Sequence, residues 1–155
     1  MQGYIRRRPV HPRVVATERR PTVVFLTICA KDRKPILATG AAHQVIVEAW
    51  ARADTWVVGR YVVMPDHVHL FCAPRDDEIS LAAWVHYWKS LSSKHWPQPA
   101  ARPVWQPDFW DTRLRRGDRY ESKWEYVRAN PVRAGLVEDP DDWPYAGELY
   151  TLSWS

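Results

Sequence analysis

The two histidines in the segment RYVVMPDHVHLFCAP are the residues whose type and spacing first suggest chemistry. His67 and His69 interrupt an apolar run that is typical of a buried strand. Because side chains on a strand alternate between its two faces, both imidazoles share one face and lie about 7 Å apart along the strand. Two such imidazoles can bind one divalent cation if another segment supplies a third ligand. The alternative is a pair of half-exposed polar residues on a solvated sheet face.

The segment KWEYVRANP supplies candidates for the missing ligand and for a reacting group. Tyr126 and Asn130 are four residues apart, so they share one face of a predicted helix. The amide oxygen of Asn130 could complete a His-His-Asn site, and the phenol of Tyr126 would lie one turn away, beside the same ion. A helix-packing tyrosine and an asparagine before proline are each common, so it is the combination that indicates a site. The neighbouring Lys123 and Glu125 are expected to be solvated helix charges.

Apolar patterning and turn residues indicate the elements that must position these groups. The prediction comprises strands over residues 22–30, 55–64, 67–73 and 109–114 and helices over 41–53, 79–94 and 119–130. Ser80 is expected to cap the second helix, whereas Asp118 caps the third and Pro131 stops it. This order predicts an α+β, ferredoxin-like (RRM-like) sandwich: an antiparallel four-stranded sheet with helices on one face and an additional helix carrying Tyr126. The other face of the sheet is expected to be open to a ligand.

The length and composition indicate one globular domain preceded by a basic segment. The 155 residues are predicted to divide into a basic arm at 1–20, a single domain at 21–150 and a C-terminal tail at 151–155. The apolar stretch after Pro131 is expected to pack back on the domain. The formal net charge of +4 favours a polyanionic partner, and 10 tryptophans, Trp105 and Trp110 among them, could stack on bases or fill a core.

Cysteine usage and hydropathy bear on where the protein works. Cys29 and Cys72 lie in apolar runs and are expected to be reduced core residues. No apolar run approaches the roughly 18 residues of a membrane span, and the N-terminus has no apolar signal region. We therefore expect a cytoplasmic protein with no membrane partner.

Four blocks of the chain closely resemble, in order, the signature blocks of REP-associated tyrosine transposases: YVVMPDHVHLF, WKSLSSK, VWQPDFWDTRLR and YESKWEYVRANPVRAGLVEDPDDWPYAGEL. These enzymes belong to the HUH single-tyrosine transposases of small bacterial insertion sequences. The resemblance covers about residues 22–149. The second block is generic, whereas the histidine pair and the block around Tyr126 are specific when they occur together.

The resemblance implies a role for each residue of the candidate site. His67, His69 and Asn130 would hold a divalent cation, Mg²⁺ or Mn²⁺, and Asn130 stands where many insertion-sequence relatives have glutamine. Tyr126 would attack the scissile phosphate and form a 5′-phosphotyrosine. The cation would offset the phosphate charge and help a phenol of pKa about 10 to react at neutral pH.

The resemblance and the charge pattern together suggest the DNA contacts. The family uses the helix over 79–94 near DNA, although a solvated amphipathic helix is the alternative. The arginines beside the Tyr126 helix, like those of the N-terminal arm, suit sequence-tolerant contacts to the DNA backbone. The predicted DNA-binding residues are Lys89, Ser90, Lys94, Arg113, Arg115 and Arg116.

The resulting functional hypothesis is metal-dependent nicking and strand transfer on single-stranded DNA that forms hairpins or palindromic repeats. The alternative is a non-catalytic, ferredoxin-like module that binds nucleic acid without cutting it. A metal phosphohydrolase is a third class, but the sequence lacks the carboxylate ligands that such sites usually have. A monomer and a homodimer both remain open, because relatives complete the site either within one chain or between two.

Overall fold

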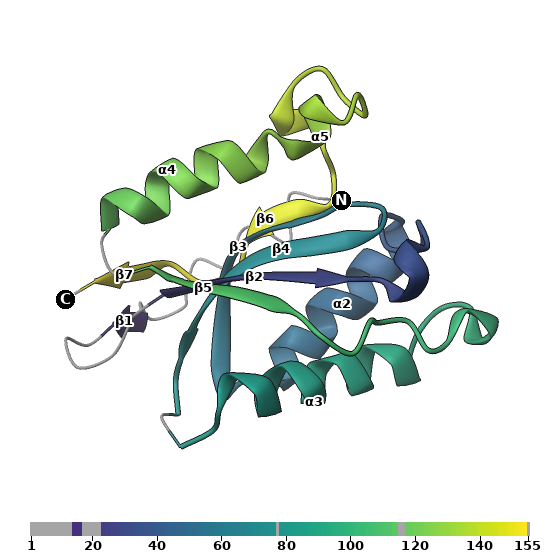
Figure 1. The fold of residues 1–155 in the computed structure, drawn as a ribbon, viewed down its shortest axis with the longest axis horizontal. Helices are drawn as coiled ribbons and strands as arrows, with labels where there is room; N and C mark the ends of the chain where they lie inside the picture. The colour runs from purple at the N-terminus through teal and green to yellow at the C-terminus, as the bar shows by residue number, and fades with distance from the viewer. Residues whose placement is uncertain (1–13, 17–22, 77, 115–116, 155) are drawn as a thin grey trace.

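The computed structural model describes residues 14–16, 23–76, 78–114 and 117–154 (Figure 1). The main elements are β2 Val23–Cys29, α2 Gly40–Arg52, β3 Trp56–Val63, β4 His67–Pro74, α3 Leu81–Lys94, β5 Trp110–Leu114, α4 Gly117–Arg128 and β6 Ala146–Glu148. The strands form one antiparallel sheet in the order β5-β2-β4-β3-β6. Helices α2 and α3 cover one face of this sheet, and α4 lies over the other (Figure 1).

Short elements complete the architecture. Strand β1 pairs in parallel with β7, and α5 follows α4 directly. Of the predicted N-terminal arm, only β1 lies within the described residues. The short elements are β1 Val14–Ala16, η1 Lys31–Arg33, η2 Pro99–Ala101, α5 Asn130–Arg133, η3 Pro140–Asp142 and β7 Leu152–Trp154.

The predicted order of strands and helices is confirmed. The hydroxyl of Ser80 accepts a hydrogen bond from the Ala83 amide at 3.1 Å, so this residue caps α3 as expected. Strands β3 and β4 form the predicted antiparallel hairpin. The sheet has a fifth strand beyond the predicted four, because β6 from the C-terminal region adds to the free edge of β3.

The expectation of an open sheet face is wrong, because apolar side chains project from both faces. Leu26 and Leu70 pack under α2 and α3 in one core. Phe25 and Phe71, each adjacent in sequence to one of these leucines, pack in a second core under α4. A sheet that is apolar on both sides must be covered on both, and here α4 and the C-terminal region cover the second side.

Two boundaries of the third helix also differ from the prediction. Helix α4 begins at Gly117, one residue before the predicted cap Asp118. Pro131 does not stop this helix; it lies in the first turn of α5, which begins at Asn130. Proline is well suited to that position because the amide that it lacks would have no partner within the helix.

The C-terminal region packs back on the domain, as predicted. The indole nitrogen of Trp143 donates a hydrogen bond to the Val63 carbonyl at 3.0 Å, and β6 pairs with β3. Cys29 and Cys72 are free and buried, which confirms that both are reduced core residues. Across the described residues, no helix has the length and apolarity needed to span a membrane.

A buried histidine should make the stability of the fold fall in mild acid. His43 of α2 lies in the core with its Nε2 2.8 Å from the Tyr61 hydroxyl, and burial lowers its pKa to about 4. The unfolded chain binds a proton near the ordinary histidine pKa of about 6.5, whereas the folded chain does not. As the pH falls below about 6.5, the unfolded state therefore binds a proton that the folded state does not bind. The free energy of unfolding decreases until the pH reaches the folded pKa of His43, about 4.

We expect this histidine to remove about 2 kcal/mol of unfolding free energy between about pH 7.5 and about pH 5. Urea denaturation of the wild-type protein and of His43→Gln at both pH values measures the contribution. The variant should show a smaller loss, although not none, because burial also lowers the pKa of His69. An equal loss in both proteins would contradict the assignment to His43.

Candidate active site

Strand β4 places both imidazoles of the histidine pair on the face covered by α4. Val68 and Leu70 point into the core under α2 and α3, so His67 and His69 point the opposite way. The centroids of the two imidazole rings are 4.7 Å apart. Both side chains are only partly buried, which leaves them accessible from the cleft beside α4. The shared face expected from their spacing is confirmed.

Each imidazole is oriented by a contact to its Nδ1 atom. The Nδ1 of His67 lies 2.8 Å from the Asp66 carboxylate, which also accepts from Arg33 at 3.0 Å. The Nδ1 of His69 lies 2.9 Å from the hydroxyl of Thr27 on β2. Such contacts fix the ring orientation and leave Nε2 as the nitrogen that could bind an ion.

The charge states of these groups suit a metal ligand set. Burial, followed by electrostatic repulsion from His67, Lys123 and Arg133, lowers the pKa of His69 to about 3, so its imidazole is neutral at physiological pH. Partial burial alone would raise the pKa of Asp66, but the hydrogen bond and charge of His67 and the Arg33 guanidinium lower it overall. An ionised carboxylate behind one imidazole and a neutral second imidazole are both favourable for cation binding.

The four residues of the candidate site meet at one cleft, of ≈ 500 Å³, between the sheet and α4. His67 and His69 form part of its wall, and Tyr126 and Asn130 line it from α4 and α5. Among the described residues, no group of three or more His, Cys, Asp or Glu could hold a metal ion. A site here would therefore need the amide oxygen of Asn130 or a substrate oxygen beside the two imidazoles, and this donor set fits Mg²⁺ or Mn²⁺. The remaining lining residues are Phe25, Met64, Lys123, Val127, Arg133 and Ala134.

The two tyrosines of α4 differ sharply in exposure. The side chain of Tyr120 is 4% exposed and packs on Phe71 at a centroid distance of 4.8 Å, and burial raises its pKa. The side chain of Tyr126 is 62% exposed and lies at the cleft. Of these two phenols, only that of Tyr126 is accessible to a large substrate.

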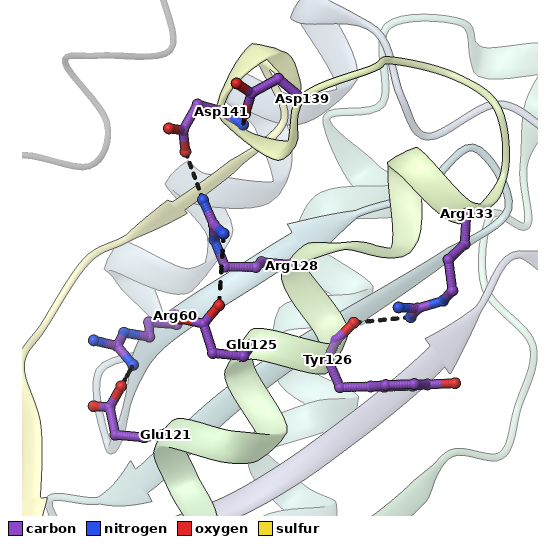
Figure 2. A network of polar contacts seen from close by, with 8 residues as sticks. All are labelled: Arg60, Glu121, Glu125, Tyr126, Arg128, Arg133, Asp139 and Asp141. Atoms are coloured by element: carbon purple, nitrogen blue, oxygen red, sulfur yellow. Dashed lines mark hydrogen bonds and ion pairs between the residues drawn. The ribbon is translucent and has the colours of Figure 1, made fainter.

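Arg133 is a residue of the cleft that the sequence did not single out. Its Nη2 donates to the Tyr126 carbonyl at 2.8 Å and to the Asn130 side-chain oxygen. Its guanidinium carbon lies 3.9 Å from the centroid of the Tyr126 ring, and Figure 2 shows the side chain turned back towards α4. Its spacing, three residues after Asn130 and seven after Tyr126, was the signal available in the sequence.

Lys123 also lies in the cleft rather than on a fully solvated face, contrary to the expectation. Its Nζ is 4.8 Å from the centroid of the Phe25 ring. Glu125 is exposed, as expected, and lies 3.6 Å from Arg128. Two cations, Lys123 and Arg133, therefore stand on the α4 side of the cleft.

The opposite flank of α4 is held by ion pairs (Figure 2). Arg60 of β3 lies 3.1 Å from Glu121 of α4 and 3.6 Å from Glu148 of β6. Arg128, near the end of α4, lies 2.6 Å from Asp141 of η3. These pairs tie the helix to the sheet and to the C-terminal region on the flank that does not carry Tyr126.

The predicted DNA contacts on α3 lie on the far side of the sheet from this cleft. Lys89 donates to the carbonyls of Gln106 and Pro107 at 2.7 and 3.1 Å, so it ties α3 to the following loop. Ser90 and Lys94 are exposed. The structure does not bring any of these three α3 residues to the histidine pair.

Two residues of β5 that the sequence analysis named, Arg113 and Trp110, lie on opposite faces of the sheet. Arg113 pairs in register with Val24, whose side chain faces α2 and α3, so Arg113 lies on that side. Trp110 pairs with Thr27, the partner of His69, and is 57% exposed on the side of the cleft, whereas Trp105 is buried. The predicted contacts Arg115 and Arg116 lie outside the described residues.

Comparison with known proteins gives consistent similarities. The model of a family described as IS200-like transposases matches residues 22–125, a span that includes both histidines and ends one residue before Tyr126. A REP-associated tyrosine transposase of Escherichia coli K12 is 26% identical over 143 residues, covering 84% of this chain and 83% of the relative. A relative from Haemophilus influenzae is 26% identical over 110 residues, covering 59% and 62%.

A solved structure shares the fold. It is the REP-associated tyrosine transposase bound to a REP hairpin, with a TM-score of 0.71 and 22% identity, covering 88% of this chain and 80% of that one. The identity between these two chains is low, so the similarity supports the arrangement of strands and helices rather than individual contacts.

Proposed function

The chain belongs to the IS200-like transposase family, and from this premise we propose that it cuts and rejoins single-stranded hairpin DNA through a covalent bond to Tyr126. The observation that carries the proposal is the cleft at which an exposed phenol, two imidazoles and an amide meet. The resemblance to REP-associated tyrosine transposases, one of them bound to a REP hairpin, supports palindromic hairpin DNA as the substrate.

In the proposed reaction the phenol oxygen of Tyr126 attacks the scissile phosphorus. The new bond joins this oxygen to phosphorus, the bond from phosphorus to the 3′ oxygen breaks, and the phenol proton is lost while the leaving oxygen becomes a 3′-OH. The intermediate is a 5′-phosphotyrosine. Because the ester conserves the phosphodiester bond energy, attack by a 3′-OH rejoins the strand without ATP.

We propose that His67, His69 and Asn130 bind the divalent cation. A bound cation would supply charge neutralisation at the scissile phosphate. The protein contributes the geometry: Asp66 and Thr27 hold the two rings through Nδ1, and the sheet places both imidazoles in the lining of the cleft. Lys123 and Arg133 add positive charge beside the same cleft, where a phosphate backbone would enter.

The DNA is proposed to lie across the α4 side of the sheet. The exposed indole of Trp110 at the sheet edge offers a surface for stacking an unpaired base. The residues Ser90, Lys94 and Arg113 lie towards the other side, so we propose them only for contacts to more distant parts of a hairpin.

Formation of a covalent adduct tests this function directly. The protein is incubated with end-labelled single-stranded hairpin DNA and Mg²⁺ and then analysed on a denaturing gel. A labelled band that survives denaturation, and that protease removes, is the expected result. Tight hairpin binding with no such band, across hairpins of varied sequence, would favour the non-catalytic binding module instead.

A further inference from the structure

Arg133 donates hydrogen bonds both to a proposed metal ligand and to the backbone of the proposed nucleophile. We propose that Arg133 is a positioning residue that holds the side-chain oxygen of Asn130 in the metal-free protein and releases it when a divalent cation binds. This inference rests on the metal site of the proposed function. It assigns to Arg133 a competition with the cation for one oxygen atom.

The contacts of Arg133 support a competition of this kind. The Nη2 of Arg133 lies between two acceptors, the Asn130 side-chain oxygen and the Tyr126 carbonyl, and the guanidinium stacks on the Tyr126 ring. A guanidinium has only donors and a permanent positive charge. A divalent cation on the same amide oxygen would lie close to that charge, and the two would repel each other. Binding of one at Asn130 therefore disfavours binding of the other.

Release would also give Arg133 a second partner. Its guanidinium lies in the cleft that Tyr126 lines, where the proposed reaction places the scissile phosphate. Guanidinium groups bind phosphate oxygens through two parallel hydrogen bonds. We therefore infer an exchange in which Arg133 leaves Asn130 to the cation and binds the phosphate.

A purely structural role gives the opposite expectation. Arg133 donates to a carbonyl in the last turns of α4, and a basic side chain there stabilises a helix end. If this were its whole role, removing the side chain would loosen the cleft and weaken metal binding. The competition predicts that metal binding becomes tighter.

The experiment is a double-mutant cycle on Mn²⁺ affinity without DNA. Isothermal titration calorimetry gives the Kd of Mn²⁺ for wild type, Arg133→Met, Asn130→Ala and the double variant. Electron paramagnetic resonance, which detects the free Mn²⁺, gives the same constant independently. We expect Arg133→Met to bind Mn²⁺ about tenfold more tightly than wild type, the scale of one hydrogen bond from a charged donor. In the Asn130→Ala background the same substitution should change the affinity far less, because the contested oxygen is absent.

Two further variants separate competition from general repulsion. Lys123→Met removes the second cation that lines the cleft, whose ammonium group lies over the Phe25 ring rather than at Asn130. The proposal would be overturned if Lys123→Met raised the Mn²⁺ affinity as much as Arg133→Met does. It would also be overturned if Arg133→Met raised this affinity equally in the wild-type and Asn130→Ala backgrounds. If circular dichroism shows that Arg133→Met does not fold, Arg133→Lys replaces it in the cycle. The expected increase in Mn²⁺ affinity is then smaller, because lysine keeps the positive charge but lacks the paired donors of the guanidinium.

Failure of the proposed metal site gives a different result. His67→Ala, titrated beside the cycle, should bind Mn²⁺ at least about 100-fold more weakly than wild type. If no protein of the series binds Mn²⁺, or if His67→Ala binds it unchanged, both this inference and the metal site are wrong. Binding that depends on His67 but not on Arg133 overturns the inference alone.

Discussion

Tyr126→Phe should bind hairpin DNA as tightly as the wild-type protein and form no covalent adduct with it. The substitution removes one oxygen atom from a ring that is 62% exposed, so neither the core nor the free energy of unfolding should change measurably. Without the nucleophile, the yield of adduct and of cleaved strand should fall by at least about 10³-fold. Denaturing gels give the adduct yield, and fluorescence anisotropy with the same labelled hairpin gives the affinity.

Tyr87→Phe is the matched control for this variant. Tyr87 is 51% exposed on α3, on the far side of the sheet from the cleft, so loss of its hydroxyl should leave adduct formation unchanged. If Tyr126→Phe still forms the adduct, another residue is the nucleophile. Tyr120 would be a poor candidate even then, because its phenol is buried.

His67→Ala should also lose cleavage, but through a different cause that excess metal can partly reverse. The variant keeps the nucleophile and loses one imidazole, so the affinity for Mg²⁺ or Mn²⁺ should fall by at least about 100-fold. A rising series of Mn²⁺ concentrations should restore a fraction of the adduct. The same series should restore none in Tyr126→Phe, because no ion supplies the missing oxygen.

Asn130→Ala gives the graded comparison for the metal ligands. Water replaces a neutral oxygen ligand more readily than it replaces an imidazole held on a strand. The adduct yield of Asn130→Ala should therefore lie between the yields of wild type and of His67→Ala. Adduct yields for the three proteins at each Mn²⁺ concentration provide the measurement. Equal activity of His67→Ala and wild type at low Mg²⁺ would remove the histidine pair from the mechanism.

The strands and the common face of His67 and His69 could be predicted from the sequence because the strand period of two is strict. The residues that orient the rings are harder to find. Thr27 contacts His69 only because β2 lies beside β4 in one register, and no local pattern specifies that neighbour. The second core was visible in principle, since Phe25 and Phe71 place large apolar groups on the face that was expected to be open.

The end of α4 shows where local rules compete. Proline disfavours a helix interior, which led to the expectation that Pro131 stops the helix, but the first turn of a new helix accepts it. The helix is therefore interrupted between Arg128 and Asn130, and the chain continues as α5. Arg133 lies in α5, three residues after Asn130, so its hydrogen bond to the Tyr126 carbonyl reaches across this break to α4.

The covering of the second sheet face by late segments has a consequence for synthesis on the ribosome. The histidine strand emerges before α4, which begins at residue 117, and the segments that support this helix, with Trp143 and β6, follow it. A nascent or truncated chain that ends before these segments carries Tyr126 without the ion pair from Arg128 to Asp141 and without the indole bond to β3. The order of the elements along the chain thus delays a complete cleft until the segments around Trp143 and β6 have also been made.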